Sequence, residues 1–309
     1  MLDSPTGPAE AVGQPPRLTR ATAGEPGEAE DPIGGRAIHH LVREIPGVRI
    51  YDILCTKRNR RWATDSDFEG FGLALVRQGG FLRRALGTEG YADATSAFFH
   101  PPTVEQHISH PRNGRDRCTA VTFTEDAIVP FAGDGFLPVG LIPTTAEIDL
   151  LHRRLVADLG GSTETWQLEV HLTHLVASIV ELGSPGRVSA KRTGTSKRHR
   201  KLADQVREAI AADPAGASLR TLSRELGYSP FHVCRTFGRV TGETITAHRN
   251  RVRVTQALDR LMAGERDLAS LAADLGFADQ SHLARVVRSL VGSPPSHVRQ
   301  LFKETGRPA

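Results

Sequence analysis

Two short stretches of the sequence carry side chains that can contact the edges of DNA bases. Arginine can hydrogen-bond guanine through two donors, glutamine can do the same with adenine, and an aromatic or small apolar group can contact the thymine methyl group. If both stretches are helical, each presents these residue types on one face: Phe231, Cys234, Arg235 and Arg239 in the first, and Gln280, Ser281, Ala284, Arg285 and Arg288 in the second. These faces are candidates for insertion into a major groove.

The two stretches belong to a repeated segment. The phrase "LGYSPFHVCRTFGRVTG" begins at Leu226, and "LGFADQSHLARVVRSLVG", which is longer by one residue, begins at Leu275. Gly227 recurs 49 positions later as Gly276, whereas Gly242 recurs 50 positions later as Gly292. The additional residue is therefore expected in the turn that follows the first glycine.

Each copy predicts a helix, a turn and a second helix. Ser218 and Asp267 are good N-caps for the first helices, and Gly227 and Gly276 suit the left-handed conformation in which helices commonly end. The second helices bury residues at i, i+4 and i+7, which are Val233, Phe237 and Val240 in one copy and Leu283, Val287 and Leu290 in the other. This pattern is that of the helix-turn-helix.

A long helix is expected between the copies, over "TITAHRNRVRVTQALDRLMAG". Its apolar side is formed by Ile245, Val252, Ala257, Leu258 and Leu261. Roughly 19 helical residues span about 28 Å, and successive major grooves on one face of B-DNA lie roughly 34 Å apart. One chain could thus place two recognition helices in adjacent groove segments. The alternative is an ordinary helical bundle whose arginines are merely solvated.

Charge is distributed unevenly along the 309 residues. From Arg198 to Ala309, 18 Lys and Arg exceed 11 Asp and Glu by seven, so the remainder carries −3 of the overall +4. A basic C-terminal third indicates a polyanionic partner for that part alone. No stretch is long and apolar enough for a membrane span, the first residues lack the basic region and apolar run typical of a secretory leader, and the three cysteines are widely spaced. We therefore expect a cytoplasmic protein with no membrane partner.

The N-terminal half shows β-type periodicity followed by helical periodicity. Short runs such as "GVRIYDIL" and "CTAVTFTE" predict a small antiparallel barrel or sandwich, and Gly79-Gly80 between two runs predicts a hairpin. After Pro143, two helices are expected, with apolar faces that contain Ile148, Leu151, Leu155 and Leu159, and then Leu168, Leu172, Leu175, Ile179 and Leu182. They could cap the sheets or associate two subunits.

No catalytic residue, metal site or cofactor is predicted for the N-terminal half. His100, His107 and His110 cluster in the sequence but lack the close His-x-His pair of metal cupins, and surface or core histidines explain them. For a small effector, the barrel interior is the expected pocket, with Trp62, Phe71, Leu73, Phe81 and Phe99 in its lining. An ordinary β-domain core explains the same five residues equally well.

Residues 202–302 resemble the DNA-binding domain of AraC/XylS-type bacterial transcription regulators. The resemblance is carried mainly by "DLASLAADLGFADQSHLARVVRSLVGSPPSHVR", including its final Pro-x-x-x-x-Arg from Pro294 to Arg299. It implies seven helices that form two helix-turn-helix units joined by a long helix. It implies base contacts from Phe231, Cys234, Arg235, Gln280, Ser281, Ala284 and Arg285, and backbone contacts from Arg239 and Arg288. Leu283 and Val287 depart from the aromatic residues frequent at these positions, and Gly238 from the usual Lys.

The sequence therefore predicts an α+β protein with five segments. These are a disordered tail at 1–34, a cupin-like β-barrel with a helical pair at 35–182, a flexible basic linker at 183–201, the all-α DNA-binding domain at 202–302, and a tail at 303–309. We expect a transcription activator, not an enzyme, that binds double-stranded DNA, a small-molecule effector and RNA polymerase, and that dimerises through the helices within 144–182. The alternatives are a cupin-type metal enzyme and an alkyl-transfer repair protein with a helix-turn-helix appendage.

Overall fold

The computed structural model describes residues 37–57, 61–65, 70–110, 115–132, 137–161, 163–184 and 196–305. The predicted tail at 1–34 lies outside these residues, as do most of the predicted linker and the last four residues of the chain. No helix in the described ranges is long and apolar enough to cross a membrane.

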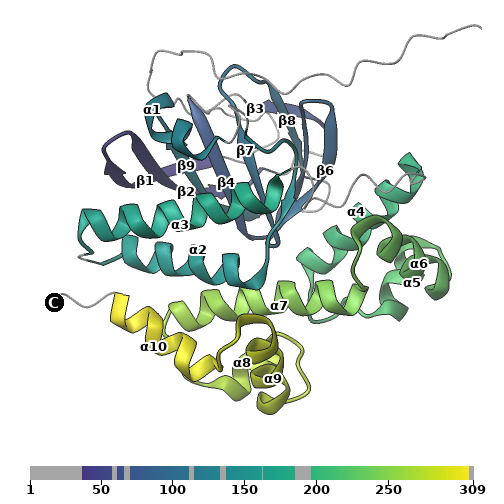
Figure 1. The fold of residues 1–309 in the computed structure, drawn as a ribbon. Helices are drawn as coiled ribbons and strands as arrows, with labels where there is room; N and C mark the ends of the chain where they lie inside the picture. The colour runs from purple at the N-terminus through teal and green to yellow at the C-terminus, as the bar shows by residue number, and fades with distance from the viewer. Residues whose placement is uncertain are drawn as a thin grey trace, which may run out of the picture.

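Two antiparallel sheets form the N-terminal part (Figure 1). The larger has the strand order β1-β2-β9-β4-β7-β10, and the smaller has the order β3-β8-β5-β6. The strands are β1 Ala37–Ile45, β2 Val48–Cys55, β3 Ala63–Asp65, β4 Phe71–Gln78, β5 Gly80–Ala85, β6 Thr88–Asp93, β7 Ser96–His100, β8 Gln106–Ser109, β9 Asp116–Phe123 and β10 Ile142–Pro143. Two short helical turns, α1 Glu125–Ile128 and η1 Val129–Phe131, follow β9. Together with the helices that follow, this architecture confirms the α+β prediction.

Alternation along the strands divides the apolar side chains between two cores. Successive side chains point to opposite faces of a sheet. Ala74 and Val76 of β4 therefore join an inner core between the sheets, while Leu73 and Leu75 join an outer core beneath the helices. The inner core consists of Ile53, Ala74, Val76, Phe81, Ala92, Phe98, Cys118 and Ala120.

The predicted hairpin at Gly79-Gly80 is wrong. Strand β4 pairs with β7 and β9, whereas β5 pairs with β6 and β8 in the other sheet. The turn instead carries the chain from one sheet to the other. It requires glycine because Gly79 has φ +68° and a Cβ there would lie 2.2 Å from the carbonyl oxygen of Arg115. A glycine pair signals a tight reversal, but it does not specify the next pairing partner.

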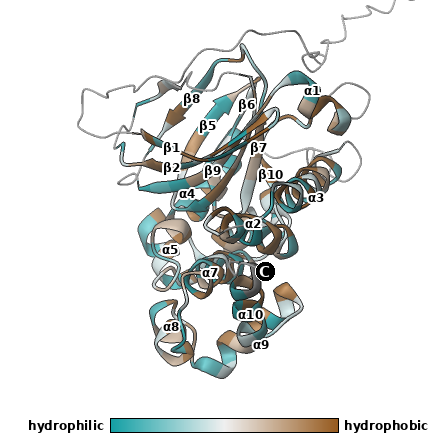
Figure 2. Ribbon diagram, turned by 90° about the vertical axis from the view of Figure 1, so that its left-hand side faces the viewer, coloured by the Kyte–Doolittle hydropathy of each residue, from teal (hydrophilic) through white to brown (hydrophobic). Residues whose placement is uncertain are grey.

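Helices α2 (Ala146–Leu159) and α3 (Thr165–Gly183) are the predicted helical pair. Leu168, Leu172, Leu175 and Ile179 of α3 are buried in the outer core. Helix α2 lies between α3 and the C-terminal helices, and Figure 2 shows α2 and α7 between the strands and helices α8 to α10. One face of α2 packs against the C-terminal domain, since Ala146 belongs to a core formed mostly by those helices.

The C-terminal part has the seven helices that the resemblance implies. They are α4 Lys197–Ala212, α5 Leu219–Leu226, α6 Pro230–Thr241, α7 Ile245–Met262, α8 Leu268–Asp274, α9 Gln280–Val291 and α10 Pro295–Thr305. Helix α7 belongs to two separate cores. Ile245 and Val252 pack with α4, α5 and α6, while Leu258 and Leu261 pack with α8, α9 and α10. The predicted apolar side of the connector is confirmed.

Candidate DNA-binding surface

The first helix-turn-helix unit is formed by α5 and α6. The Ser218 hydroxyl accepts a hydrogen bond from the Thr221 amide at 3.1 Å, and α5 ends at Gly227, which has the left-handed φ of 71°. Ser229 then caps α6. The His232 ring stacks on Tyr228 in the turn, with 5.0 Å between ring centroids. The turn between α5 and α6 is thus fixed by caps and by one aromatic pair.

The second unit, α8 and α9, repeats this design with a longer turn. Three residues separate Gly276 from Gln280, compared with two between Gly227 and Pro230, which confirms where the additional residue lies. Asp279 caps α9 by accepting from the His282 amide at 2.7 Å. His282 Nδ1 in turn accepts from the Ala278 amide at 3.3 Å. Neither histidine was predicted to hold its turn, although His232 and His282 occupy corresponding positions in the two copies of the repeat.

The predicted recognition faces are exposed on both second helices. Val233, Phe237, Leu283 and Val287 are fully buried. On the opposite face, Phe231 is 72% exposed, Ala284 is half-buried, and the other predicted contacts are exposed, namely Cys234, Arg235, Arg239, Gln280, Ser281, Arg285 and Arg288. The structure thus presents both sets of side chains to solvent, and their roles at DNA stay predictions.

Part of the basic charge of this region is used inside the protein. Arg253 is buried, and it donates to the carbonyl oxygens of Pro214 and Ala215 at 2.9 and 3.1 Å. Arg249 donates to the Ala217 carbonyl oxygen at 3.1 Å. Both contacts tie α7 to the segment before α5. The net charge that indicated a polyanionic partner therefore overstates the positive charge available at the surface.

The family model described as a helix-turn-helix domain matches residues 222–301. These residues begin within α5 and contain α6, α7, α8 and α9 in full. This region is a helix-turn-helix domain. The match agrees with the two helix-turn-helix units seen in the structure.

Among solved structures, the chain is similar to ToxT from Vibrio cholerae O395, with 10% identity, 82% of this chain and 97% of that chain covered, and a TM-score of 0.32. It is also similar to the C-terminal domain of AraT, a response regulator from Geobacillus stearothermophilus, with 17% identity, 35% and 88% covered, and a TM-score of 0.30. A DNA-binding transcriptional dual regulator from Escherichia coli K-12 gives 18% identity, 33% and 93% covered, and a TM-score of 0.31. No curated protein sequence matches the chain at a significant level.

Buried ion pairs join the helix-turn-helix domain to the sheets. Asp93, which ends β6, lies 2.9 Å from Arg207 Nε of α4 and 3.3 Å from His248 Nε2 of α7. Burial alone would raise the pKa of Asp93, but Arg207 and His248 hold it well below its usual range. Burial alone would lower the pKa of His248, yet Asp93 and Glu243, 3.0 Å from Nδ1, raise it. A second link joins Arg153 of α2 to Asp259 of α7 at 3.1 Å.

Of the five residues predicted to line an effector pocket inside the barrel, only Phe81 lines a cavity between the sheets. This cavity has a volume of about 60 Å³. Phe71, Leu73 and Phe99 instead point into the outer core, because they occupy the opposite phase of β4 and β7. Trp62 lies outside the lining as well, with the Arg84 guanidinium over its ring at 4.2 Å.

The three clustered histidines have different environments. His107 is about one-third exposed beside Glu105, and His100 is buried on β7. Burial lowers the pKa of His100 to about 4. Only His110 lines the cavity, where it meets Cys55 and Asp116. The sequence grouping of the three histidines therefore does not correspond to a spatial group.

Proposed function

We propose that this chain is a sequence-specific transcription regulator that reads two adjacent major-groove segments of one duplex, one with α6 and one with α9. The observation that carries the proposal is the pair of exposed recognition faces joined by the single helix α7. The 18 residues of α7 span about 27 Å, against roughly 34 Å between successive grooves. Because its two halves belong to different cores, α7 fixes the separation of the units.

The contacts proposed at DNA fall into two classes. Phe231, Cys234 and Arg235 of α6, with Gln280, Ser281, Ala284 and Arg285 of α9, would contact bases. Arg239 and Arg288 lie in the last turns of α6 and α9 and would contact phosphates, which position a protein but carry no sequence information. Cys234 and Ala284 offer bases little hydrogen bonding. Specificity would therefore depend mainly on Arg235, Gln280 and Arg285.

Selection of genomic fragments by the purified full-length protein, at a stated salt concentration, tests this function. We expect a shared motif with two short blocks about one helical turn apart. Arg235→Ala should remove the preference at one block and Arg285→Ala at the other. Arg49→Ala, which removes an exposed arginine on β2, is the matched control and should leave the motif unchanged. Bound fragments without a common motif would contradict sequence-specific reading.

We further propose that the regulator is a homodimer and that α3 forms its interface. Trp166 and Val170, one turn apart on α3, are 61% and 56% exposed. Helix α2 is less available, because the C-terminal domain already covers one of its faces. A twofold interface presents the same patch from both subunits. An apolar stripe on a helix that is otherwise packed suits such a contact.

The output proposed is activation through RNA polymerase, which the AraC/XylS resemblance favours. Transcription in vitro from a selected promoter, with purified polymerase, tests the direction. More transcript on addition of the protein would support activation, and less would show repression. A small effector bound between the sheets would modulate this output.

We also propose that the chain is not an enzyme. Alkyl transfer to a cysteine needs an activated thiolate. Burial, with a further contribution from Asp116, raises the pKa of the Cys118 thiol well above its usual value. That shift is opposite to the one that activates a thiol nucleophile. Incubation of the protein with alkylated DNA should leave every cysteine unmodified, as mass spectrometry would show.

A further inference from the structure

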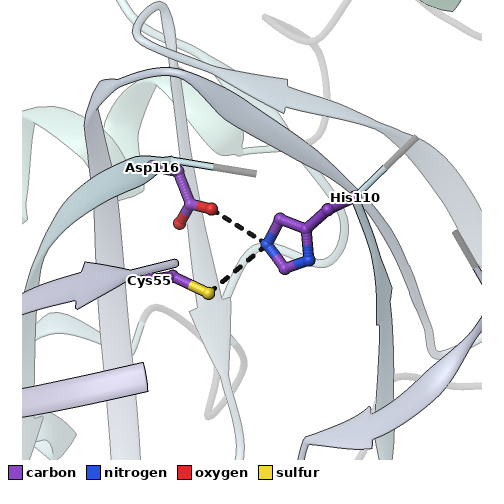
Figure 3. Close-up of side chains that lie close together, drawn as sticks. All are labelled: Cys55, His110 and Asp116. Carbon is purple, nitrogen blue, oxygen red and sulfur yellow. Dashed lines mark hydrogen bonds and ion pairs between the residues drawn. The ribbon is translucent and has the colours of Figure 1, made fainter. Parts of the chain in front are cut away.

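Three donor atoms from three strands converge at one end of the inner core (Figure 3). Cys55 is the last residue of β2, Asp116 is the first residue of β9, and His110 directly follows β8. Cys55 Sγ lies 3.5 Å from His110 Nε2, and His110 Nε2 lies 2.9 Å from Asp116 Oδ1. All three side chains are buried. The cluster therefore lies away from bulk water.

The geometry differs from that of a catalytic triad. In a triad, the nucleophile and the carboxylate contact opposite nitrogens of the histidine ring. Here both the thiol and the carboxylate approach the same atom, Nε2, as Figure 3 shows. A proton relay through the ring is not possible in this arrangement. Convergence of sulfur, nitrogen and oxygen on one point is instead the arrangement of a metal site.

The distances between these atoms are close to those around a tetrahedral metal ion. Zinc binds sulfur at about 2.3 Å and nitrogen or oxygen at about 2.0 to 2.2 Å, so its ligands lie roughly 3.3 to 3.6 Å from one another. The sulfur–nitrogen distance of 3.5 Å already falls in this range. All ligand atoms lie within 4.8 Å of one another, so modest side-chain shifts would suffice.

The adjacent cavity suits an ion better than an organic molecule. Its volume is about 60 Å³, whereas pockets for organic ligands hold roughly 300 to 1,000 Å³. A water molecule occupies about 30 Å³ of liquid. The cavity can therefore hold an ion with a water molecule at an open coordination position. Phe81 and Phe98 supply apolar parts of its wall, and Lys57 and Thr64 supply polar parts.

We propose that Cys55, His110 and Asp116 bind one divalent transition metal ion of the zinc class, with the fourth coordination position facing this cavity. A thiolate and an imidazole select such an ion over Mg²⁺ or Ca²⁺, which take oxygen ligands. On binding, Cys55 would coordinate as the thiolate and release its thiol proton, and His110 would coordinate through Nε2 as the neutral imidazole with its proton on Nδ1. Cys118, whose Sγ lies 3.8 Å from Asp116 Oδ2, orients the carboxylate.

The site also suggests which effector the protein senses, a step that rests on the proposed function. Cys55 and Asp116 are directly paired across β2 and β9, so a metal would clamp two neighbouring strands of the larger sheet and the end of β8. Those sheets are joined to the helix-turn-helix domain through Asp93. Metal occupancy is thereby coupled to DNA binding, and the metal ion is the effector.

Titration of the reduced full-length protein with Co²⁺ tests the site directly, because thiolate coordination gives a charge-transfer absorption band. We expect one Co²⁺ per chain, displaced by Zn²⁺. Cys55→Ser should abolish the band, and His110→Ala should lower the affinity by more than about 100-fold, beyond the cost of losing an outer-sphere partner. Cys234→Ser and His107→Ala, at an exposed cysteine and at a partly exposed histidine close to His110 in the sequence, are matched controls that should bind like wild type.

Asp116→Asn keeps the size of the side chain and removes the anionic ligand, so it tests the site if another variant fails to fold. Circular dichroism shows which variants fold. A folded wild-type protein without the band would overturn the site. An unchanged band in Cys55→Ser, or a band lost in Cys234→Ser, would overturn it as well.

DNA binding with Zn²⁺ and with a chelator then tests the effector role. We expect affinity for the selected motif to change at least tenfold in wild type and to stay constant in Asp116→Asn. A bound metal that leaves DNA affinity unchanged would overturn the effector role. A protein that binds metal but no DNA under either condition would overturn the proposed function and leave the metal site intact.

Discussion

Single side chains on α9 decide whether the proposed surface reads sequence. Arg285 and Arg288 are both exposed, and Arg285 lies one turn nearer the N-terminus of the helix, the end that approaches the bases in helix-turn-helix complexes. We expect Arg285→Ala to cost about 1 to 3 kcal/mol at the specific site and to relax the sequence preference there. Competition titrations with site variants at fixed salt would measure both effects. Equal losses on all sequences would instead make Arg285 a phosphate contact.

Arg288→Ala should behave differently. A contact to a DNA phosphate contributes equally to binding of every sequence. Without this contact, DNA binding by the variant releases fewer counterions than binding by wild type. Affinity should therefore fall nearly uniformly, and the slope of log affinity against log salt should decrease in magnitude by about one. Titrations at several salt concentrations give that slope. A loss confined to the specific site would contradict the assignment.

Helical periodicity made the exposed residues of α6 and α9 predictable. Other functional residues could not be predicted, because no local sequence pattern marks them. The exposed faces of α6 and α9 could be predicted because the buried positions recur every three or four residues. Cys55 lies 55 residues before His110, and Asp116 lies six residues after it. The three meet only because β2 pairs with β9 while β8 belongs to the facing sheet. The internal use of Arg253 was equally hidden, since a buried and a solvated arginine look alike in a sequence.

At the scale of elements, the glycines that end α5 and precede α9 provide a matched pair of substitutions. Both have φ +71°, but a Cβ on Gly227 meets no atom within 4 Å, whereas one on Gly276 lies 2.8 Å from the Ala215 Cα. Gly227→Ala should cost about 1 to 2 kcal/mol from backbone conformation alone. Gly276→Ala should cost roughly 1 to 3 kcal/mol more, because the added methyl group overpacks this contact.

Urea denaturation of both variants, followed by circular dichroism, would measure these costs. Equal destabilisation would mean that the segment around Ala215 moves aside without cost. The comparison also tests whether the second unit depends on the segment before α5, which Arg253 already ties to α7.

The apolar stripe on α3 gives a second prediction for an element. Trp166→Glu places a charge at the centre of the proposed interface, so we expect a monomer where wild type is a dimer. Sedimentation equilibrium would measure the mass. Leu41→Glu, at another exposed apolar residue, on β1, is the control and should remain dimeric. If Leu41→Glu dissociates the dimer instead, the interface involves the sheet edge.

Sequence patterns predicted many of the helices and strands, but they did not predict which strands pair with one another. Helices α5 to α9 of the C-terminal domain followed from caps, glycines and apolar spacing, all of which act within one or two turns, whereas α4 and α10 followed only from the AraC/XylS resemblance. Some strands of the N-terminal part, such as β2 and β9, also followed from short β-type runs, whereas β1, β3, β8 and β10 were not predicted. The pairing of the strands did not follow from such runs, since Gly79-Gly80 allows either a hairpin or a crossing between sheets, and contacts distant in the sequence decide between them.

For the whole molecule, the buried network around Asp93 predicts a dependence of stability on pH. The pKa of His248 is raised above 6.5 in the folded protein, so the folded state holds its proton more tightly than the unfolded chain does. The stabilisation is therefore complete below pH 6.5 and is lost as the pH rises through the folded pKa. We expect the urea midpoint of the full-length protein to fall over that interval.

His248→Asn should flatten this part of the pH profile. The matched comparison is His107→Asn, which changes a partly exposed histidine outside the network and should keep the slope of wild type. A slope that survives in His248→Asn would assign the titration to another group.

The membership of α7 in two cores has a consequence for the evolution of binding sites. A promoter that gains one base pair between the two recognition blocks moves the second block by about 3.4 Å and rotates it by roughly a tenth of a turn. A chain with a flexible tether would tolerate that insertion, whereas this chain would have to bend the duplex or disrupt a packed core. Regulated promoters should therefore differ in the base sequence of the two recognition blocks, while the distance between the blocks stays constant. New binding sites would then arise by point substitution and not by insertion.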